Sequence, residues 1–177
     1  MLERIWAGWR ADYVSSAPSR TEPADAVGSV FTQLLASGEP DEATHVLHRG
    51  ESVFAILNIH PYASGHLLVV PYREVADLAE LTGAETTELW ATVTDGVAAV
   101  RAAYSPEGLN VGLNLGRPAG GSVPTHLHVH VVPRWIGDSN FMTAISGTQT
   151  LPESLPSSAR RLRDAWPRRG SAAARRG

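Results

Sequence analysis

Three of the seven histidines of the chain fall within five residues, in the stretch THLHVHVVPRW at 125–135. An alternation with period two is typical of a β-strand, whose successive side chains point to opposite faces. We therefore expect His126, His128 and His130 on one face and the aliphatic residues between them on the other. Neighbouring imidazoles on such a face lie roughly 7 Å apart, close enough to act on one small anionic group such as a phosphate.

Three interpretations of this histidine cluster compete. Histidines that are merely hydrogen-bonded on a polar sheet face would explain one of them, but explain three in strict alternation poorly. A metal site is the stronger rival, yet zinc would need further Asp, Glu or Cys ligands nearby, and residues 126–137 contain none. The third interpretation is nucleophilic catalysis at phosphorus, in which one imidazole attacks and its neighbours donate hydrogen bonds to phosphate oxygens.

Composition limits the kind of protein that could hold this cluster. The 177 residues are 43% hydrophobic, with no apolar run long enough to cross a membrane and no charged-then-apolar leader, which predicts one soluble, cytoplasmic domain. The chain contains no cysteine, which excludes disulfides, thiolate nucleophiles and cysteine-bound zinc. Histidine is left as the strongest candidate nucleophile or ligand.

The net charge of −3 hides an asymmetry between the C-terminus and the rest of the chain. Residues 160–177 hold seven arginines against Asp164 alone, whereas the remainder carries 8 Arg against 17 Asp and Glu. Arginine mixed with Gly, Ser and Ala, without apolar periodicity, predicts a solvated and partly disordered tail that does not pack on the domain. Binding of nucleic acid by this tail is the less favoured alternative.

The elements that position the histidines can be predicted from the apolar pattern. Apolar residues from Leu89 to Val100 at spacings of four, four and three predict one long amphipathic helix over 85–104. Three strands are expected upstream, at about 44–49, 52–58 and 66–70.

A further strand is expected directly before the histidine strand. Leucine and valine alternate with asparagine and glycine from Leu109 to Leu115, which predicts a strand with a polar face of little bulk. This strand and the histidine strand are expected to be antiparallel neighbours, so that Asn114 shares a face with the histidines. Asn114 and the loop Gly120-Gly121-Ser122 offer amide, hydroxyl and backbone N–H donors for phosphate oxygens, although a strand-end cap and a plain turn are the alternatives.

Residues 126–132 fit the pattern His-φ-His-φ-His-φ-φ without a mismatch, and the chain thereby resembles the histidine triad (HIT) family. The resemblance covers about residues 3–145 and is closest to the branch of actinobacterial diadenosine tetraphosphate phosphorylases. The other stretches that carry it are IWAGWRADYV (5–14), LNIHPYASGHLLVVP (57–71), NLG (114–116) and VPRWIGDSNFM (132–142).

The resemblance implies an α+β, HIT-like fold with a five-stranded antiparallel sheet and two helices, paired in a homodimer. The chain would then divide into an N-terminal segment and linker (1–28), the HIT domain (29–145) and a C-terminal extension with the arginine-rich tail (146–177).

The resemblance also implies a reaction and a role for each histidine. The chain would be a nucleotidyltransferase that cleaves diadenosine tetraphosphate with inorganic phosphate to ADP and ATP, through a nucleotidyl-histidine intermediate. By position, His128 would attack the α-phosphorus and His130 would hydrogen-bond the phosphate or the leaving group. His126, backed by His66, would orient the nucleophile. Asn58 stands where family members hold the ribose.

The expected ligands are purine nucleotides, dinucleoside polyphosphates and inorganic phosphate. No bound cofactor is expected, and magnesium would bind only together with the substrate phosphates. Besides Asn58, the candidate substrate-binding residues are Asn114, Gly121, Ser122, Arg134 and Trp135.

Two departures from the family pattern bear on metal and acceptor. Many members carry a zinc-binding Cys-x-x-Cys where this chain has Ser29-Val30-Phe31-Thr32, so we predict no structural zinc. Ser122 stands where hydrolase-type members carry glutamine, which favours phosphate over water as the acceptor. A hydrolase of dinucleoside polyphosphates or nucleoside phosphoramidates is the alternative enzyme. A nucleotide-binding or metal-binding module without turnover is the alternative from another class.

Overall fold

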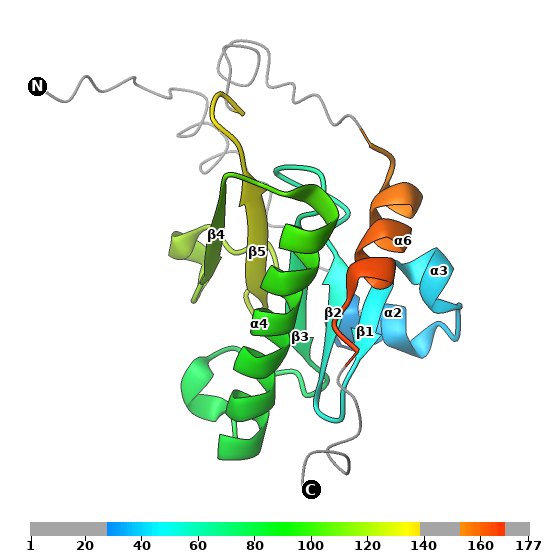
Figure 1. The fold of residues 1–177 in the computed structure, drawn as a ribbon. Helices are drawn as coiled ribbons and strands as arrows, with labels where there is room; N and C mark the ends of the chain where they lie inside the picture. The colour runs from blue at the N-terminus through cyan, green and yellow to red at the C-terminus, as the bar shows by residue number, and fades with distance from the viewer. Residues whose placement is uncertain (1–27, 139–152, 169–177) are drawn as a thin grey trace, which may run out of the picture.

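The computed structural model describes residues 28–138 and 153–168. Five strands in these residues form one sheet in the order β1-β2-β3-β5-β4, and every neighbouring pair is antiparallel. Figure 1 shows this sheet with its helices packed around it. The expected five-stranded antiparallel sheet is confirmed, as is the pairing of the histidine strand with the strand before it. The strands are β1 (Val46–Arg49), β2 (Val53–Leu57), β3 (Leu67–Pro71), β4 (Gly108–Leu113) and β5 (Val129–Arg134).

Four α-helices accompany the sheet within the described residues, where two were expected. The additional ones include α2, whose start at Ser29 carried an N-cap signal ahead of the apolar Phe31, Leu34 and Leu35. The helices are α2 (Val30–Ala36), α3 (Asp41–Thr44), α4 (Gly83–Tyr104) and α6 (Leu155–Ala165), with 3-10 turns at Leu78–Glu80 (η1) and Arg117–Ala119 (η2).

The long helix α4 confirms the helix predicted at 85–104, and it begins two residues earlier. Thr82 explains that start, because its hydroxyl accepts a hydrogen bond from the Glu85 N–H while the Glu85 carboxylate accepts one from the Thr82 N–H. This reciprocal capping box satisfies two backbone donors at the first turn.

The sheet has a different hydrophobic core on each face, because alternate residues of a strand point to opposite sides. One core lies beneath α4 and α6, and its strand residues include Val53, Ala55, Leu57, Leu67, Val69, Val129 and Val131. The other core lies beneath α2 and contains Phe31, Val46, Phe54, Ile56, Leu68 and Val70. Helix α4 packs on β2, β3 and β5, while α6 packs on α4, β1 and β2 (Figure 1).

The prediction that the arginine-rich C-terminus does not pack is wrong for residues 160–166. Ala159 and Leu162 of α6 are fully buried in the core beneath α4. The Arg163 guanidinium donates to the Val46 carbonyl at 2.8 Å and to the Asp41 carbonyl at 2.5 Å, which ties α6 to α3 and β1. Trp166 stacks on His48 with ring centroids 5.2 Å apart. A few buried apolar residues and one half-buried guanidinium are enough to dock a helix whose composition predicted a solvated segment.

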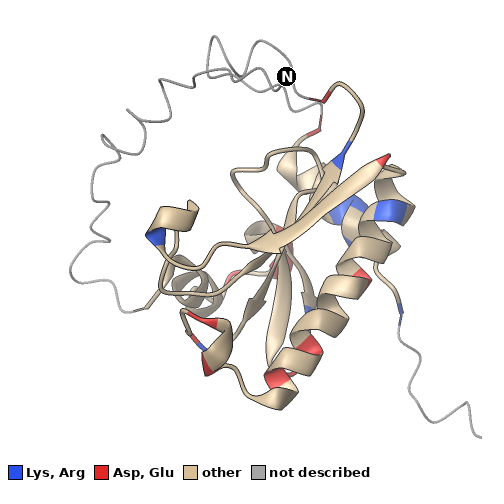
Figure 2. Ribbon diagram, turned by 90° about the vertical axis from the view of Figure 1, so that its left-hand side faces the viewer, with Lys and Arg blue, Asp and Glu red and all other residues tan. Residues whose placement is uncertain are grey.

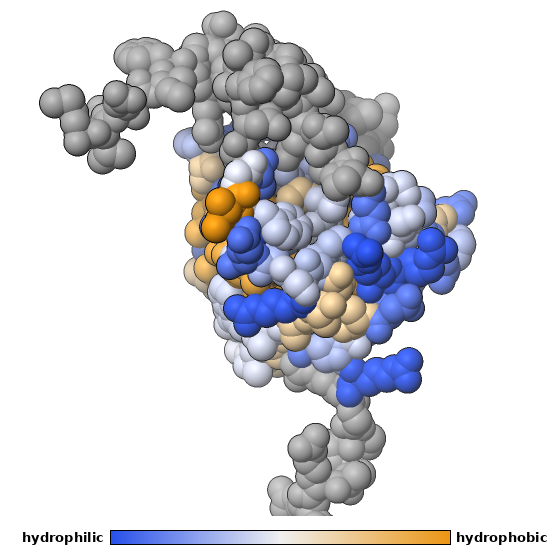
Figure 3. Space-filling view, turned by 45° about the horizontal axis from the view of Figure 1, so that its top comes forward, coloured by the Kyte–Doolittle hydropathy of each residue, from blue (hydrophilic) through white to orange (hydrophobic). Residues whose placement is uncertain are grey.

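Charged and apolar side chains are distributed as expected for a protein surface. Figure 2 shows arginines along α6 and carboxylates along α4, with few charges on the strands of the sheet. Exposed large hydrophobic residues are scattered over several elements, and the face in Figure 3 is mostly pale or hydrophilic with small apolar spots. No helix in residues 28–138 and 153–168 has the length and apolar character needed to cross a membrane.

Replacing Leu162 by alanine should destabilise the protein by about 2–5 kcal/mol, because it leaves a cavity in a core that α6 completes. Arg160→Ala on the exposed side of the same helix is the control, and it should change the free energy of unfolding by no more than about 0.5 kcal/mol. Urea unfolding followed by circular dichroism measures both. Equal stability of Leu162→Ala and wild type would show that α6 does not dock.

Candidate active site

The three histidines share one face, as predicted, but only His130 lies within a strand. Strand β5 begins at Val129, so His126 and His128 occupy the segment that leads into it. Phe31 of α2 packs against both of their rings, with centroids 5.4 Å and 5.5 Å away. The intervening Leu127, Val129 and Val131 are buried in the core on the opposite face. The alternation of faces therefore continues through residues 126–128, although the hydrogen-bonded strand begins only at Val129.

His66 contacts His130, and the expectation that it backs His126 is wrong. Nε2 of His66 lies 2.9 Å from Nδ1 of His130. The reason is the register of β3 and β5, in which Leu68 pairs with His130. His66 then lies diagonally beside His130 on the same face. His126 lies roughly 20 Å from His66, toward the far end of β3. There it meets Pro71, whose carbonyl lies 2.8 Å from Nε2 of His126.

A chain of hydrogen bonds assigns the tautomers of His66 and His130. The Tyr62 backbone N–H donates to Nδ1 of His66 at 3.1 Å, so the proton of the neutral ring is on Nε2. That Nε2–H donates to Nδ1 of His130, which places the proton of His130 on its own Nε2. Nε2 of His130 is buried without a partner among the described residues. It is therefore a donor held ready for a ligand oxygen.

A second set of bonds fixes His126 and His128. The Ser29 hydroxyl lies 2.5 Å from Nδ1 of His126, and the Pro71 carbonyl accepts from its Nε2–H. Nδ1 of His128 donates to the His126 carbonyl at 2.8 Å. Nε2 of His128 then carries the lone pair, and no hydrogen bond from the described residues engages it. A neutral imidazole with a free, unprotonated nitrogen is a nucleophile.

Burial keeps all four rings neutral near pH 7. Burial, followed by the proximity of His130 and His128, lowers the pKa of His66 to about 3. Burial and then His128 lower the pKa of His130 to about 4. Burial also lowers the pKa of His126 and of His128, although their hydrogen bonds to the Pro71 and His126 carbonyls act in the opposite direction. The nucleophilic and donor forms assigned above are thus the populated ones.

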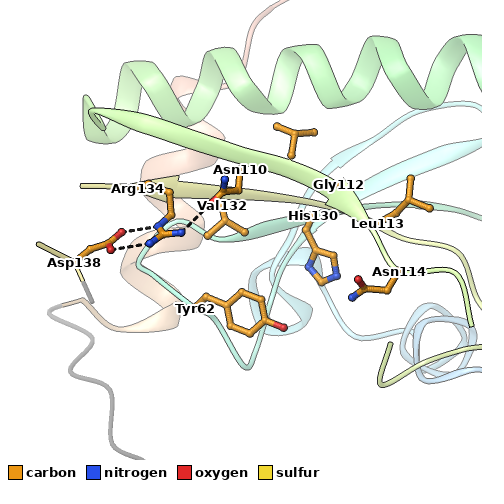
Figure 4. A pocket seen from close by; sticks show the side chains of 10 residues that line it. Tyr62, Asn110, Gly112, Leu113, Asn114, His130, Val132, Arg134 and Asp138 are labelled. Atoms are coloured by element: carbon orange, nitrogen blue, oxygen red, sulfur yellow. Dashed lines mark hydrogen bonds and ion pairs between the residues drawn. The ribbon is translucent and has the colours of Figure 1, made fainter. Parts of the chain in front are cut away.

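A pocket of about 510 Å³ opens beside His130 over strands β4 and β5. Figure 4 shows the His130 ring between Asn114 and Tyr62, with Gly112 on the neighbouring strand. Gly112 pairs directly with His130, and a Cβ built on it would meet no atom within 4 Å. The missing side chain therefore leaves open the space in front of the imidazole. His128 is not part of the pocket lining; its ring lies behind His130, with centroids 5.0 Å apart.

Arg134 lies at the other end of this pocket and is already paired. Its guanidinium donates to both carboxylate oxygens of Asp138, at 2.6 Å and 2.8 Å, and to the Asn110 side-chain oxygen at 2.8 Å (Figure 4). A phosphate at Arg134 would have to compete with Asp138 for the guanidinium. Trp135 follows in the chain but is not among the lining residues.

Of the other predicted substrate-binding residues, Asn114 lines the pocket, whereas Asn58, Gly121 and Ser122 do not. The Asn58 side-chain oxygen accepts from the His60 N–H at 2.9 Å, and its amide nitrogen lies 3.4 Å from the His66 ring. Gly121 lies against Asn114, since a Cβ on Gly121 would be 3.6 Å from that of Asn114. Ser122 is exposed.

The glycine loop offers fewer backbone donors than the sequence suggested. The Gly120 N–H is used within the loop, where it donates to the Arg117 carbonyl at 2.9 Å. Of the predicted backbone donors, this one is therefore not available to phosphate.

Some residues of the site were missed by the sequence reasoning. Ser29 and Phe31 were considered only as substitutes for a zinc motif, although Ser29 is an N-cap and Phe31 an apolar position of a short helix. Tyr62 and Gly112 lie in stretches that were assigned to the family pattern and to a strand, but neither was singled out. The small polar face predicted for 109–115 was the available signal for Gly112.

Comparison with known proteins places the chain in a family. The sequence profile of the HIT domain matches residues 39–135. The chain is also 43% identical over 169 residues to an AP-4-A phosphorylase of Mycobacterium tuberculosis, with 94% of this chain and 86% of that protein covered. The chain belongs to the HIT family, as its resemblance predicted.

Two further relatives show how the family varies. A bis(5'-nucleosyl)-tetraphosphatase (asymmetrical) of Schizosaccharomyces pombe is 36% identical over 91 residues, which cover 51% of this chain and 50% of that protein. The crystal structure of a zinc-bound histidine triad family protein from Mycobacterium smegmatis has a TM-score of 0.63 and 29% identity, with 78% of this chain and 92% of that chain covered.

The residues at 29 and 32 do not fit a zinc ion. Ser29 and Thr32 present neutral hydroxyls, and Ser29 contacts His126 directly at 2.5 Å, so that no ion could lie between them. Among the described residues, no group of three or more His, Cys, Asp or Glu side chains could hold a metal. That the protein carries no structural zinc stays a prediction for metal analysis.

The protein should lose stability as the pH falls from about 6.5 toward 4. His66 and His130 have pKa values depressed below the ordinary 6.5, so in this range the unfolded chain binds protons that the folded protein does not. The stability that the two neutral rings contribute is fully present above pH 6.5. For His66 alone, its loss lowers the free energy of unfolding by on the order of a few kcal/mol. Denaturant unfolding at a series of pH values measures the slope.

His66→Gln should flatten this slope, whereas His60→Gln on the exposed part of the same loop should leave it as in wild type. A wild-type slope retained in His66→Gln would show that the His66 ring is not held neutral by burial.

Proposed function

We propose that the protein is a nucleotidyltransferase that cleaves diadenosine tetraphosphate with inorganic phosphate, giving ADP and ATP. The observation that carries this proposal is the pair of complementary nitrogens on two adjacent rings, the unprotonated Nε2 of His128 and the unpartnered Nε2–H of His130, which lines the pocket. One is a nucleophile and the other is a hydrogen-bond donor, and their rings are adjacent. Transfer of a nucleotidyl group is favoured by both functions at one phosphorus atom.

In the first step, Nε2 of His128 attacks the α-phosphorus of the bound dinucleotide. The N–P bond forms as the bond to the bridging oxygen breaks, and that oxygen leaves as ATP. His130 stabilises the developing negative charge with its Nε2–H. The positive charge that appears on the His128 ring is stabilised by the His126 carbonyl, which already accepts its Nδ1–H.

In the second step, an oxygen of inorganic phosphate attacks the phosphorus of the nucleotidyl-histidine. The P–O bond forms, the N–P bond breaks, and ADP leaves while His128 recovers its lone pair. Magnesium would assist by neutralising the substrate phosphates. No resident cofactor takes part in this proposal.

The choice of phosphate over water rests on relatives and on residues around Ser122. The relative from Mycobacterium tuberculosis is named an AP-4-A phosphorylase and matches over nearly the whole chain. The exposed, small Ser122 and the neighbouring Gly121 would leave room for an anion larger than water. Hydrolysis is the second candidate, because the Schizosaccharomyces pombe relative is named a tetraphosphatase.

The substrate-binding roles of Asn58, Asn114, Arg134 and Trp135 remain proposals, as do a homodimer, a cytoplasmic location and the division into segments at 1–28, 29–145 and 146–177. Asn114 and Arg134 are supported by their place in the pocket lining. The division at residue 146 must allow for α6, which packs on the domain core. The predictions for residues 1–27, 139–152 and 169–177 lie outside the described residues.

His128→Ala should reduce turnover of diadenosine tetraphosphate by on the order of 10⁴-fold or more, because loss of a covalent nucleophile removes the pathway. His130→Ala should cost less, about 10²–10³-fold, as expected for one donor to a developing charge. Steady-state rates measure both, and protein incubated with labelled substrate and quenched in alkaline denaturant, which preserves the P–N bond, should carry the nucleotide on His128. Near-wild-type turnover by His128→Ala would contradict the assigned nucleophile.

Ser122→Gln should raise the ratio of hydrolysis to phosphorolysis, because a larger amide fills the space for phosphate and can position water. Product analysis on diadenosine tetraphosphate, with and without added phosphate, separates ADP plus ATP from AMP plus ATP. Thr87→Gln, on an exposed turn of α4, controls for the substitution itself. Wild-type protein that forms AMP plus ATP equally well without phosphate would establish the hydrolase instead.

A further inference from the structure

Ser29 is buried and lies outside the pocket, yet it contacts the histidine cluster directly. Its side chain is the N-cap of α2, but the capping bond from the Thr32 N–H is 3.3 Å long. The contact from the same hydroxyl to Nδ1 of His126 is 2.5 Å. The hydroxyl also lies 3.3 Å from the Thr32 hydroxyl, so the shortest of its three interactions is with the histidine, which a purely capping serine would not need.

The direction of this hydrogen bond follows from the other side of the ring. The Pro71 carbonyl can only accept, so Nε2 of His126 is the donor there and its Nδ1 must accept from the Ser29 hydroxyl. Both ring nitrogens are thereby fixed, and Phe31 packs on the ring at 89°. The His126 ring has no freedom to rotate without breaking a buried hydrogen bond.

Glu74 fixes Ser29 in turn. Its carboxylate accepts from the Ser29 N–H at 2.8 Å and from the Thr32 hydroxyl at 3.1 Å. Although burial favours the protonated acid, these hydrogen bonds lower the pKa of Glu74, so the carboxylate is charged. The start of α2 is thus held to the segment that follows β3.

The peptide unit between His126 and Leu127 links this cluster to the nucleophile. Its N–H, from Leu127, donates to the Val75 carbonyl at 2.7 Å, and its C=O, from His126, accepts from Nδ1 of His128 at 2.8 Å. The orientation of this unit decides which nitrogen of His128 carries the proton. The ring of His126 and the peptide unit belong to one residue, so fixing the ring helps to fix the carbonyl.

We infer that Ser29 is a positioning residue for the nucleotidyl transfer: by holding His126, it keeps the His126 carbonyl on Nδ1 of His128 and the lone pair of His128 on Nε2. The inference rests on the proposed function through the role of His128 alone. Ser29 touches neither the pocket nor the substrate, so its effect is on the reactivity of the nucleophile and not on binding.

The primary test is Ser29→Gly, because glycine caps a helix nearly as well as serine but has no hydroxyl. The turnover number should fall by about 10- to 100-fold, as expected when a nucleophile loses its fixed orientation, while KM stays close to the wild-type value. Ser29→Thr keeps the hydroxyl and should retain most of the activity. Thr82→Ala, which removes the N-cap hydroxyl of α4, should lower the melting temperature but not the turnover number.

A spectroscopic readout separates this inference from the proposed function. In ¹⁵N NMR of the substrate-free protein, His128 should show one neutral tautomer with its proton on Nδ1, and Ser29→Gly should show a mixture. Should wild type fail to turn over diadenosine tetraphosphate, the proposed function would be lost while the tautomer of His128 would still test the role of Ser29.

Wild-type turnover together with an unchanged His128 spectrum in Ser29→Gly would overturn the inference. If Ser29→Gly did not fold, the same spectra of Glu74→Leu would decide, with Glu74→Gln as the matched variant that keeps an acceptor for the Ser29 N–H. Mixed tautomers of His128 in Glu74→Leu but not in Glu74→Gln would support the inference. A single His128 tautomer in both variants would contradict it.

Discussion

The antiparallel pairing of β3 with β5 is the constraint on which the site depends. With Leu68 opposite His130, the residue before β3 meets the last histidine of the cluster and the residue at the end of β3 meets the first. His66 therefore donates to His130, and the Pro71 carbonyl accepts from His126. A shift of one residue in this register would turn every side chain of β5 to the opposite face and dissolve both contacts. The hydrophobic cores on the two faces of the sheet make such a shift costly, because each would lose its alternate residues.

Hydrogen bonding and burial act together on the imidazoles. Each ring except those of His128 and His130 has both nitrogens engaged, which is what burial of polar groups requires. The two exceptions each keep one Nε2 without a hydrogen-bond partner among the described residues, and the pocket opens beside His130. Low pKa values follow from the same burial, so the site gains neutral, directed nitrogens at the expense of stability in acid. Gly112 adds to this by keeping the neighbouring strand from filling the space in front of His130.

The fold covers the two faces of the sheet unequally, and this decides where a ligand can enter. Helices α4 and α6 cover one face, and α6 completes that core although its sequence is rich in arginine. The short helix α2 covers only the part of the other face near β1, β2 and β3, where it also contacts His126. Within residues 28–138 and 153–168, no α-helix covers β4 and β5 on that side. Helix α2 thus covers part of one core and also contacts the histidines. The packing of this helix is therefore in direct contact with the reactive centre.

The sequence by itself determined the face shared by His126, His128 and His130, the long helix and the antiparallel neighbourhood of β4 and β5, because these follow from local periodicity. The family pattern added the five-stranded sheet. The sequence alone could not predict the partner of His66. That contact depends on the register of two strands, and the two contacting residues, His66 and His130, are 64 residues apart in the chain. Docking of α6 and the contact of Ser29 with His126 were likewise decided only by tertiary structure. Helix α6 contains few apolar residues, so its docking could not be predicted from their pattern. A serine at a buried helix cap cannot be distinguished by sequence from a serine in a linker, because only packing separates the two cases.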